Sequence, residues 1–229
     1  MGFGAPEWDA VALSLKVATW ATLASLPFGI FVAYVLARYE FRAKQVVNAL
    51  VHLPLILPPV AVGYILLSML GPHAPMGRLL ETVGLPVAFR WSGAAIAAAV
   101  MGFPLMVRAI RLSFEAADPK LEQAAASLGA PPLRVFATIS LPLALPGVLT
   151  GAILAFAKAM GEFGATITFV SNIPGQTRTL PSAIYAFLQV PGGEGAAFRL
   201  VVVSIIIATG ALLVSELLAR RAARRLAGS

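Results

Sequence analysis

The hydrophobic residues of this chain fall into five long runs separated by shorter polar segments. The runs cover residues 11–37, 46–70, 91–108, 137–164 and 198–218. A helix needs about 20 predominantly apolar residues to cross the hydrocarbon core of a bilayer, and each run is of that order. Apolar and polar residues do not alternate with a period of two, which is the pattern of membrane β-strands. The sequence therefore predicts an all-α, polytopic membrane protein with five transmembrane helices.

The composition supports this prediction and excludes a soluble globular domain. Hydrophobic residues make up 59% of the 229 residues, charged residues make up 12%, and the mean hydropathy is +0.87. An ordinary soluble domain has roughly 45–50% apolar and about 25% charged residues. The net charge is +7. A basic excess beside membrane spans is explained by the retention of positive loops in the cytoplasm, so we expect no nucleic-acid partner.

The positive charges are distributed unevenly among the loops. Eleven of them lie in the segments 38–44, 108–136 and 220–225. A smaller group on the opposite face comprises Arg78, Arg90, Arg178 and Arg199. Loops rich in Lys and Arg remain in the cytoplasm, so the larger group predicts the cytoplasmic face. We therefore expect the N-terminus outside the cell and the C-terminus inside it.

Helix-breaking residues are frequent within the runs. The second run contains Pro54, Pro58 and Pro59 in the stretch LPLILPPVAVG. An internal proline removes a helical hydrogen bond and kinks the helix. Because lipid cannot satisfy the freed carbonyl groups, we expect these kinks to pack against other helices or to line a wet cavity. No linker or internal repeat divides the chain, which predicts one membrane domain over residues 1–229.

The polar segment 115–136, between the third and fourth runs, contains the signals of a short helix. Asp118 suits the N-cap, Pro119 the first helical position and Gly129 the stop, which predicts a helix over residues 119–128. Ten residues rise only about 15 Å, too little to span a bilayer. We expect this helix to lie across the cytoplasmic end of the bundle, where its small Ala residues fit a groove of another protein. An inert surface helix is the alternative.

The chain lacks the motifs of nucleotide, metal or covalent chemistry. It has no GxxxxGK[ST] sequence, so ATP and Mg²⁺ would be bound by a partner chain. Cysteine is absent, the only histidines are His52 and His73, and there is no HExxH motif. We therefore expect no metal site, no cofactor and no catalytic residues on this chain. An intramembrane enzyme is disfavoured because no nucleophile or acid–base pair is evident.

Part of the segment 115–136 resembles the EAA signature of bacterial ABC-importer permeases. Gln123-Ala124-Ala125 is followed after three residues by Gly129 and after nine more by Ile139-Ser140-Leu141-Pro142. Gln123 stands where the signature has glutamate, and Glu122 precedes it. The resemblance implies a coupling helix that inserts into a cleft of an ATP-binding subunit. The residues it assigns to this contact are Glu122, Gln123, Ala124, Ala125, Gly129, Ile139, Leu141 and Pro142.

Longer stretches resemble the permeases of molybdate importers, including HLPLILPPVAVGY and GEFGATITFVSNIPGQTRTLPSAIY. The resemblance implies a type I, MetI-like permease fold in the bacterial inner membrane. It also implies a second copy of the chain, two ABC ATPase subunits and an extracytoplasmic binding protein as partners. The expected substrate is molybdate, with tungstate. A sulfate or thiosulfate permease is the alternative within transporters.

Lys158 and Glu162 lie four positions apart inside the fourth run. Charges in a span are costly and usually pair inside the bundle, so the spacing predicts an ion pair. A pair that locks the bundle is the favoured interpretation, and a pair that helps to balance a divalent oxyanion is the alternative.

The residues around and after this pair could contribute a translocation path or gate. The candidates are Lys158, Gly161, Glu162, Gly164, Thr166, Thr168, Ser171 and Asn172. Neutral hydrogen-bond donors suit a site that an anion must both enter and leave, because a stronger site would trap it. An equally weighted alternative is that these Gly and Thr residues only allow close packing and hydrogen bonds between helices. In the expected periplasmic loop 171–197, we expect Arg178 and Tyr185 to face the binding protein or to close an outer gate.

Overall fold

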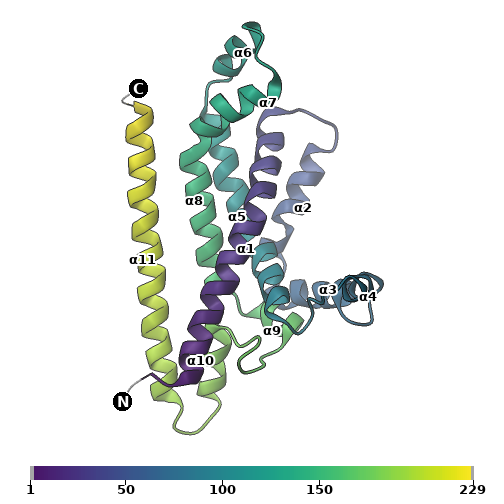
Figure 1. Ribbon diagram of the computed structural model, residues 1–229, viewed down its shortest axis with the longest axis vertical. Coiled ribbons are helices and arrows are strands. Elements are labelled where there is room, and N and C mark those ends of the chain that lie inside the picture. Colours follow the sequence, from purple (N-terminus) through teal and green to yellow (C-terminus); the bar gives the residue numbers. More distant parts are fainter. Residues whose placement is uncertain (1–2, 228–229) are drawn as a thin grey trace.

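The computed structural model describes residues 3–227, whose regular structure is entirely helical (Figure 1). The elements are α1 (Ala5–Arg38), α2 (Lys44–Ile56), α3 (Pro59–Leu70), α4 (Pro75–Thr82), α5 (Trp91–Ala116), α6 (Pro119–Ser127), α7 (Pro132–Val135), the π-helical turn η1 (Phe136–Ser140), α8 (Leu141–Met160), α9 (Gly164–Val170), α10 (Leu180–Leu188) and α11 (Glu194–Ala227). In the described part of the chain, four helical segments are long and apolar enough to cross a membrane, and the bent pair α2–α3 is a fifth candidate. The predicted all-α membrane fold is therefore confirmed.

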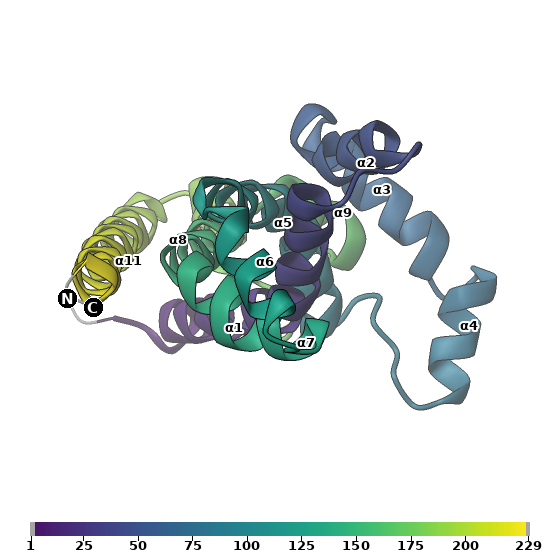
Figure 2. The same ribbon diagram turned by 90° about the horizontal axis from the view of Figure 1, so that it is seen from above.

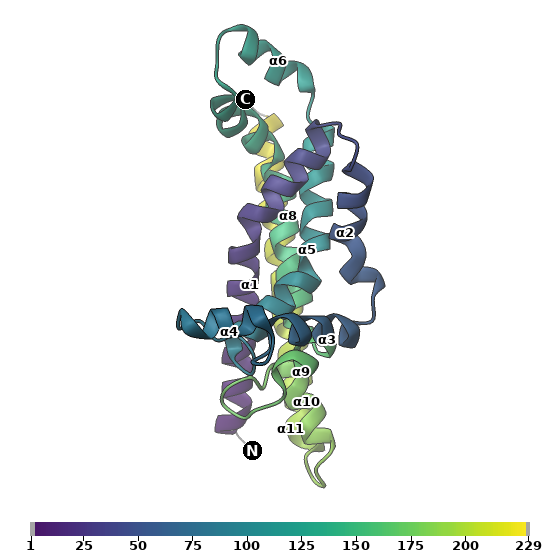
Figure 3. The same ribbon diagram turned by 90° about the vertical axis from the view of Figure 1, so that its right-hand side faces the viewer.

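The centre of the bundle is α5, along which α1 and α8 pack (Figures 1 and 3). Small residues bring α5 and α8 close together: a Cβ atom on Gly102 would lie 3.1 Å from the Ala155 carbonyl oxygen, and one on Gly147 would collide with Ser113. Helices in a bilayer associate through such close packing because lipid tails are as apolar as the helices, so the hydrophobic effect provides no driving force for their contact. The repeated Gly and Ala residues therefore specify the contact between α5 and α8.

The second apolar run is not a single helix, contrary to the sequence prediction. α2 ends at Ile56, α3 begins at Pro59, and the two helices are bent by 113°. Pro58 and Pro59 have no N–H group to continue the ladder, and Pro59 takes the first position of α3, where that group is not needed. Figure 3 shows α3 and α4 crossing the long axis of the bundle. The predicted kink is thus a full break.

The fourth run was predicted to end at residue 164, but α8 ends at Met160, and a separate short helix, α9, begins at Gly164 and continues past the run to Val170. The third helix continues beyond its predicted end at residue 108 as far as Ala116. Two short helices, α4 and α10, lie in segments expected to be loops. α10 depends on a distant residue, since its Leu180 N–H donates to Ser14 Oγ of α1 at 2.6 Å. Helices this short do not form runs of about 20 apolar residues, so that criterion does not predict them.

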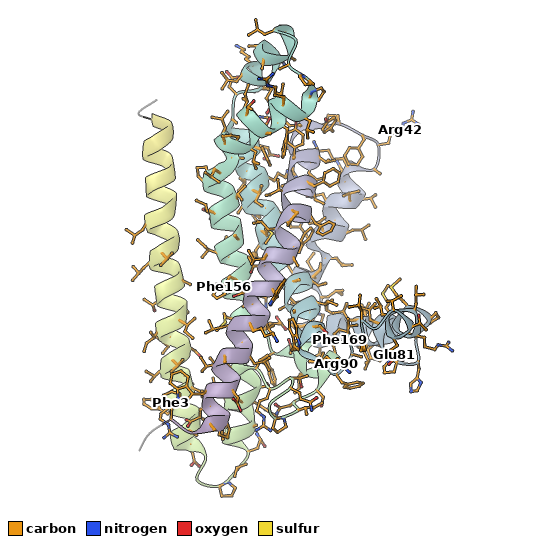
Figure 4. The ribbon with its side chains drawn as sticks, viewed as in Figure 1. Phe3, Arg42, Glu81, Arg90, Phe156 and Phe169 are labelled. Carbon is orange, nitrogen blue, oxygen red and sulfur yellow. The ribbon has the colours of Figure 1, made fainter. Side chains whose placement is uncertain are left out.

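The start of α1 and the end of α11 lie at opposite ends of the bundle (Figure 1). The end that holds the C-terminal part of α11 also holds α6, α7 and the loop with Arg42, which is labelled in Figure 4. The segments 38–44 and 108–136, which carry most of the predicted cytoplasmic cations, therefore gather at that end. The side chains of Arg220, Arg221, Arg224 and Arg225 lie outside the described residues. Seen from above, α11 and the arm formed by α3 and α4 lie at opposite edges (Figure 2).

Candidate functional site

The predicted short helix between the third and fourth runs is present as α6. Asp118 caps it, with its carboxylate accepting a hydrogen bond from Lys120 N at 2.9 Å. Gly129 adopts φ +84°, and the bonds from Gly129 N to Ala126 O and from Ala130 N to Ala125 O form a Schellman ending. A Cβ atom on Gly129 would meet nothing within 4 Å. The glycine is therefore required by backbone conformation and not by lack of space.

α6 projects beyond the end of the bundle, and none of its residues is buried (Figure 3). Gln123 and Ala124 are exposed, and Ala125 is partly exposed. Leu128, which follows the helix, is 90% exposed, and Leu133 on α7 is exposed as well. Among the described residues this end thus presents small and apolar side chains that nothing in the chain covers. Such a surface is suited to a protein partner.

Glu122 is held by the bundle instead of pointing freely outward. The Arg38 side chain at the end of α1 donates from Nε to Glu122 Oε1 at 3.0 Å and from a terminal nitrogen to the Ala117 carbonyl oxygen at 3.0 Å. The two charged side chains are 13% and 16% exposed. No sequence signal links positions 84 residues apart, so sequence analysis missed this contact.

The second half of the predicted signature lies where the segment that carries α6 rejoins the bundle at the start of α8. Ile139 belongs to η1, whereas Leu141 and Pro142 begin α8. Leu141 packs against the buried cluster around Phe114, and Tyr34 stacks edge-on against Phe136 at 4.8 Å between ring centroids. The eight predicted contact residues therefore fall into two groups. In the group formed by α6 and Gly129, Gln123, Ala124 and Gly129 are exposed. In the group at the start of α8, Ile139 and Leu141 are partly buried and Pro142 is exposed.

Lys158 and Glu162 form the predicted ion pair, with 2.8 Å between Lys158 Nζ and Glu162 Oε2. Glu162 is only 2% exposed, whereas Lys158 is 30% exposed. Glu162 does not continue the helix of Lys158, because α8 has ended; its second oxygen accepts a hydrogen bond from Ala165 N at 3.0 Å. A carboxylate at this place satisfies an orphan N–H group at the start of α9. The pair therefore joins the end of α8 to the beginning of α9.

The glycines and threonines that follow are engaged in packing between α9 and α3. A Cβ atom on Gly164 would lie 2.7 Å from Pro59 Cβ, and one on Gly63 would lie 2.8 Å from Thr168 Cβ. Thr166 is buried, and Thr168 Oγ1 donates back to the Gly164 carbonyl oxygen at 2.8 Å. Within one chain, these contacts are those of close helix packing.

Ser171 ends α9 with φ 66° and ψ −164°, a conformation that is essentially confined to glycine. The buried Thr177 supports it: Thr177 Oγ1 donates to the Ser171 carbonyl oxygen at 3.2 Å and accepts from Ile173 N at 2.9 Å. Asn172 Oδ1 accepts a hydrogen bond from Arg178 Nε at 3.1 Å. We call residues 158–179 the α8–α9 region. It gathers all eight predicted path residues along one continuous stretch.

Tyr185 lies on α10 and is half exposed. Its ring packs against Phe163, with 5.3 Å between the centroids. Arg178 thus makes its contact within the α8–α9 region, and Tyr185 contacts that region from α10. Whether either side chain meets another protein remains a prediction.

The profile of the family described as "Binding-protein-dependent transport system inner membrane component" matches residues 25–226. The chain belongs to this family, whose members are membrane components of transport systems. The fold agrees with solved permease-containing transporters. It matches a bacterial ABC transporter that imports alginate with a TM-score of 0.75 at 16% identity, covering 95% of this chain and 80% of that one. It matches the MetNI methionine ABC transporter with a TM-score of 0.68, covering 94% of each chain.

Curated relatives are much closer in sequence. The molybdenum transport system permease protein ModB of Escherichia coli K12 is 60% identical over 94% of both chains. That of Haemophilus influenzae is 52% identical over 96% of both. A probable sulfate transport system permease protein of Chlorokybus atmophyticus is 37% identical over 77% of this chain and 62% of its own length.

Proposed function

We propose that this chain is the membrane-spanning permease subunit of an ATP-driven importer of molybdate, and also of tungstate. The observation that carries the proposal is the 60% identity, over 94% of both chains, with the E. coli molybdenum permease. The sulfate-type relative is less similar and matches only 62% of its own length. We therefore favour molybdate over sulfate as the transported oxyanion.

The proposed assembly contains two copies of this chain, two ABC ATPase subunits that bind ATP and Mg²⁺, and an extracytoplasmic binding protein. α6 is the proposed coupling helix, and its exposed Gln123, Ala124 and Leu128 support a contact with another protein. The end that holds α6 then faces the cytoplasm, and the N-terminus lies outside the inner membrane. The clustering of basic loops at the α6 end supports this orientation. In this proposal, residues 1–229 form a single permease domain.

For the α8–α9 region we propose a role at the translocation path or its gate. The break between α8 and α9 supports the proposal, because irregular backbone at membrane depth is tolerated where it is packed by protein or lines a cavity. Lys158 and Glu162 hold this break together in the first instance. The second role proposed for Lys158, which is 30% exposed, is to help balance the charge of a passing oxyanion.

The decisive experiment is reconstitution of the chain with its ATPase in proteoliposomes. ATP hydrolysis is measured with binding protein loaded with molybdate, tungstate or sulfate. We expect stimulation by the first two and none above the unloaded protein with sulfate. Stimulation by sulfate alone would overturn the assignment to molybdate, whereas no stimulation by any of the three would overturn the role as an importer subunit.

A further inference from the structure

A polar cavity of about 310 Å³ lies between α2 and α5, away from the α8–α9 region. It is lined by Asn48, His52, Arg108, Arg111, Leu112 and Glu115. The lining residues of α2 lie in its first turns, and those of α5 lie in its last turns, so the cavity opens near the end of the bundle that holds α6. Arg108 is exposed and Arg111 is partly exposed, so both guanidinium groups are accessible to a ligand that enters the cavity.

Only one of the two arginines is compensated within the described chain. Arg111 donates from Nε to Glu115 Oε1 at 2.6 Å and from a terminal nitrogen to Asn48 Oδ1 at 3.0 Å. No described carboxylate pairs with Arg108. Since Glu115 balances Arg111, the cavity retains one uncompensated positive charge, that of Arg108.

The contacts already made leave guanidinium donors free for a ligand, while the second carboxylate oxygen of Glu115 and, in the neutral ring, His52 Nε2 remain as acceptors. His52 Nδ1 lies 2.8 Å from the Asn48 carbonyl oxygen, which can only accept, so the ring donates there. Arg111 uses two of its three nitrogens, and one terminal nitrogen remains. A guanidinium group presents paired N–H donors that match the oxygens of an oxyanion.

We infer that this cavity is an anion-binding site for a tetrahedral oxyanion, with Arg108 as the charge-bearing residue and Arg111 as the second donor. A volume of about 310 Å³ accommodates a phosphate-sized anion with water. Two sources could supply that chemistry near the cytoplasmic end: a free oxyanion leaving the transporter, or the phosphate of an anionic lipid. Identifying the free anion with transported molybdate rests on the proposed function, whereas anion binding itself does not.

The chain has no cysteine, so a single introduced cysteine can report the potential inside the cavity. Leu112 lines the cavity, is uncharged and is 58% exposed. Leu112→Cys in the complete transporter, in phosphatidylcholine vesicles, is treated with methanethiosulfonate reagents carrying either an anionic sulfonate or a cationic trimethylammonium group. We expect the anionic reagent to be favoured over the cationic one and Arg108→Gln to reduce this ratio about sevenfold, because one charge roughly 7 Å away in water attracts the one reagent and repels the other by about 0.6 kcal/mol each.

Matched controls isolate the cavity. Val46→Cys, exposed on α2 but outside the cavity, should be insensitive to Arg108→Gln. Arg42→Gln, which removes a loop cation, should leave the ratio at Leu112→Cys unchanged. Arg108→Lys should keep the ratio high because the charge remains. If Leu112→Cys does not react, or if Arg108→Gln leaves its ratio unchanged, the inference is overturned.

Protection by anions then tests binding and its source. Inorganic phosphate or molybdate should slow the anionic reagent at Leu112→Cys with Arg108 present, and not in the Arg108→Gln background. Repetition in vesicles that contain phosphatidylglycerol distinguishes the sources: retained protection assigns the site to a free oxyanion, and lost protection assigns it to a lipid phosphate. Absence of protection in both membranes would overturn the site. Phosphate protection requires no transport, so failure of molybdate import would overturn the proposed function alone.

Discussion

The proposed coupling segment, residues 115–136, and the α8–α9 region are both short interruptions between long helices, yet different contacts determine their geometry. α6 is defined by residues close to it in sequence: Asp118 at its start and Gly129 at its end. The α8–α9 region depends instead on burial against other elements, with Gly63 of α3 packed on α9 and Ser14 of α1 satisfying the N–H group of Leu180 just beyond it.

Because of this difference, we expect substitutions in the two regions to have different consequences for stability and for function. A helix that projects from the bundle can be altered with little effect on the core, whereas a buried junction cannot. Changes in the α8–α9 region should therefore act mainly on folding, and changes in the coupling segment mainly on work with a partner.

The largest effect is expected from Lys158→Ala. This change leaves the Glu162 carboxylate, which is 2% exposed, without its cation. Breaking a buried pair in this way should lower the free energy of unfolding by about 3 kcal/mol. The measurement is thermal unfolding of the purified protein in detergent, with Lys120→Ala on the exposed α6 as the control. The double variant Lys158→Ala/Glu162→Gln should recover part of the loss. Unchanged stability of Lys158→Ala would mean that both groups are hydrated and would favour a role in the path.

Gly129→Val should impair coupling more than folding. A β-branched residue at φ +84° costs about 1–2 kcal/mol, which is enough to unwind the end of α6. We expect uptake driven by the ATPase to fall while membrane insertion and the thermal transition of the bundle stay unchanged. Gly129→Asn is the matched control, because asparagine tolerates the left-handed conformation and should retain uptake. Equal uptake in the two variants would contradict the need for this helix ending.

Ser171→Gly tests the strained end of α9. Glycine adopts the Ser171 backbone conformation without penalty, whereas it also gives the unfolded chain more conformational entropy. We expect the strain energy relieved in the folded state to exceed this entropic cost, so that the free energy of unfolding rises by about 1 kcal/mol. Thermal unfolding should shift upward in Ser171→Gly and not in Ser171→Ala, which keeps the strain. A reduced uptake in the more stable variant would indicate that the strained conformation serves a gate, and a lower transition temperature would refute the account of strain.

The fold was predictable from sequence where signals are local and uniform. Runs of about 20 apolar residues identify the long helices, and the caps of α6 identify it to within one residue. The break at Pro58 and Pro59 was expected only as a kink, because proline forbids continuation but does not dictate the angle at which the chain resumes. α4 and α10 were missed because each is shorter than 10 residues.

The candidate sites divide in the same way. The Lys158–Glu162 pair followed from a spacing of four residues, but its link to α9 did not, because that spacing does not show that α8 ends at Met160 with Gly161 as its C-cap. The bond between Arg38 and Glu122 joins residues 84 positions apart, and only tertiary structure brings them together. Long-range polar contacts of this kind need the assembled bundle.

The smallest effect concerns the contact between α6 and the end of α1. Arg38 fixes Glu122, so the coupling segment is tied to the end of α1. A double-mutant cycle with Arg38→Gln and Glu122→Gln should give an interaction energy of about 0.5–1 kcal/mol by thermal unfolding, since both side chains are partly solvated. The charge exchange Arg38→Glu/Glu122→Arg should restore only part of this energy, because Arg38 also donates to the Ala117 carbonyl oxygen. If the pair transmits motion, each single variant should also lower uptake per ATP hydrolysed. An unchanged ratio with a measurable interaction energy would make the contact purely structural and would leave α6 independent of α1.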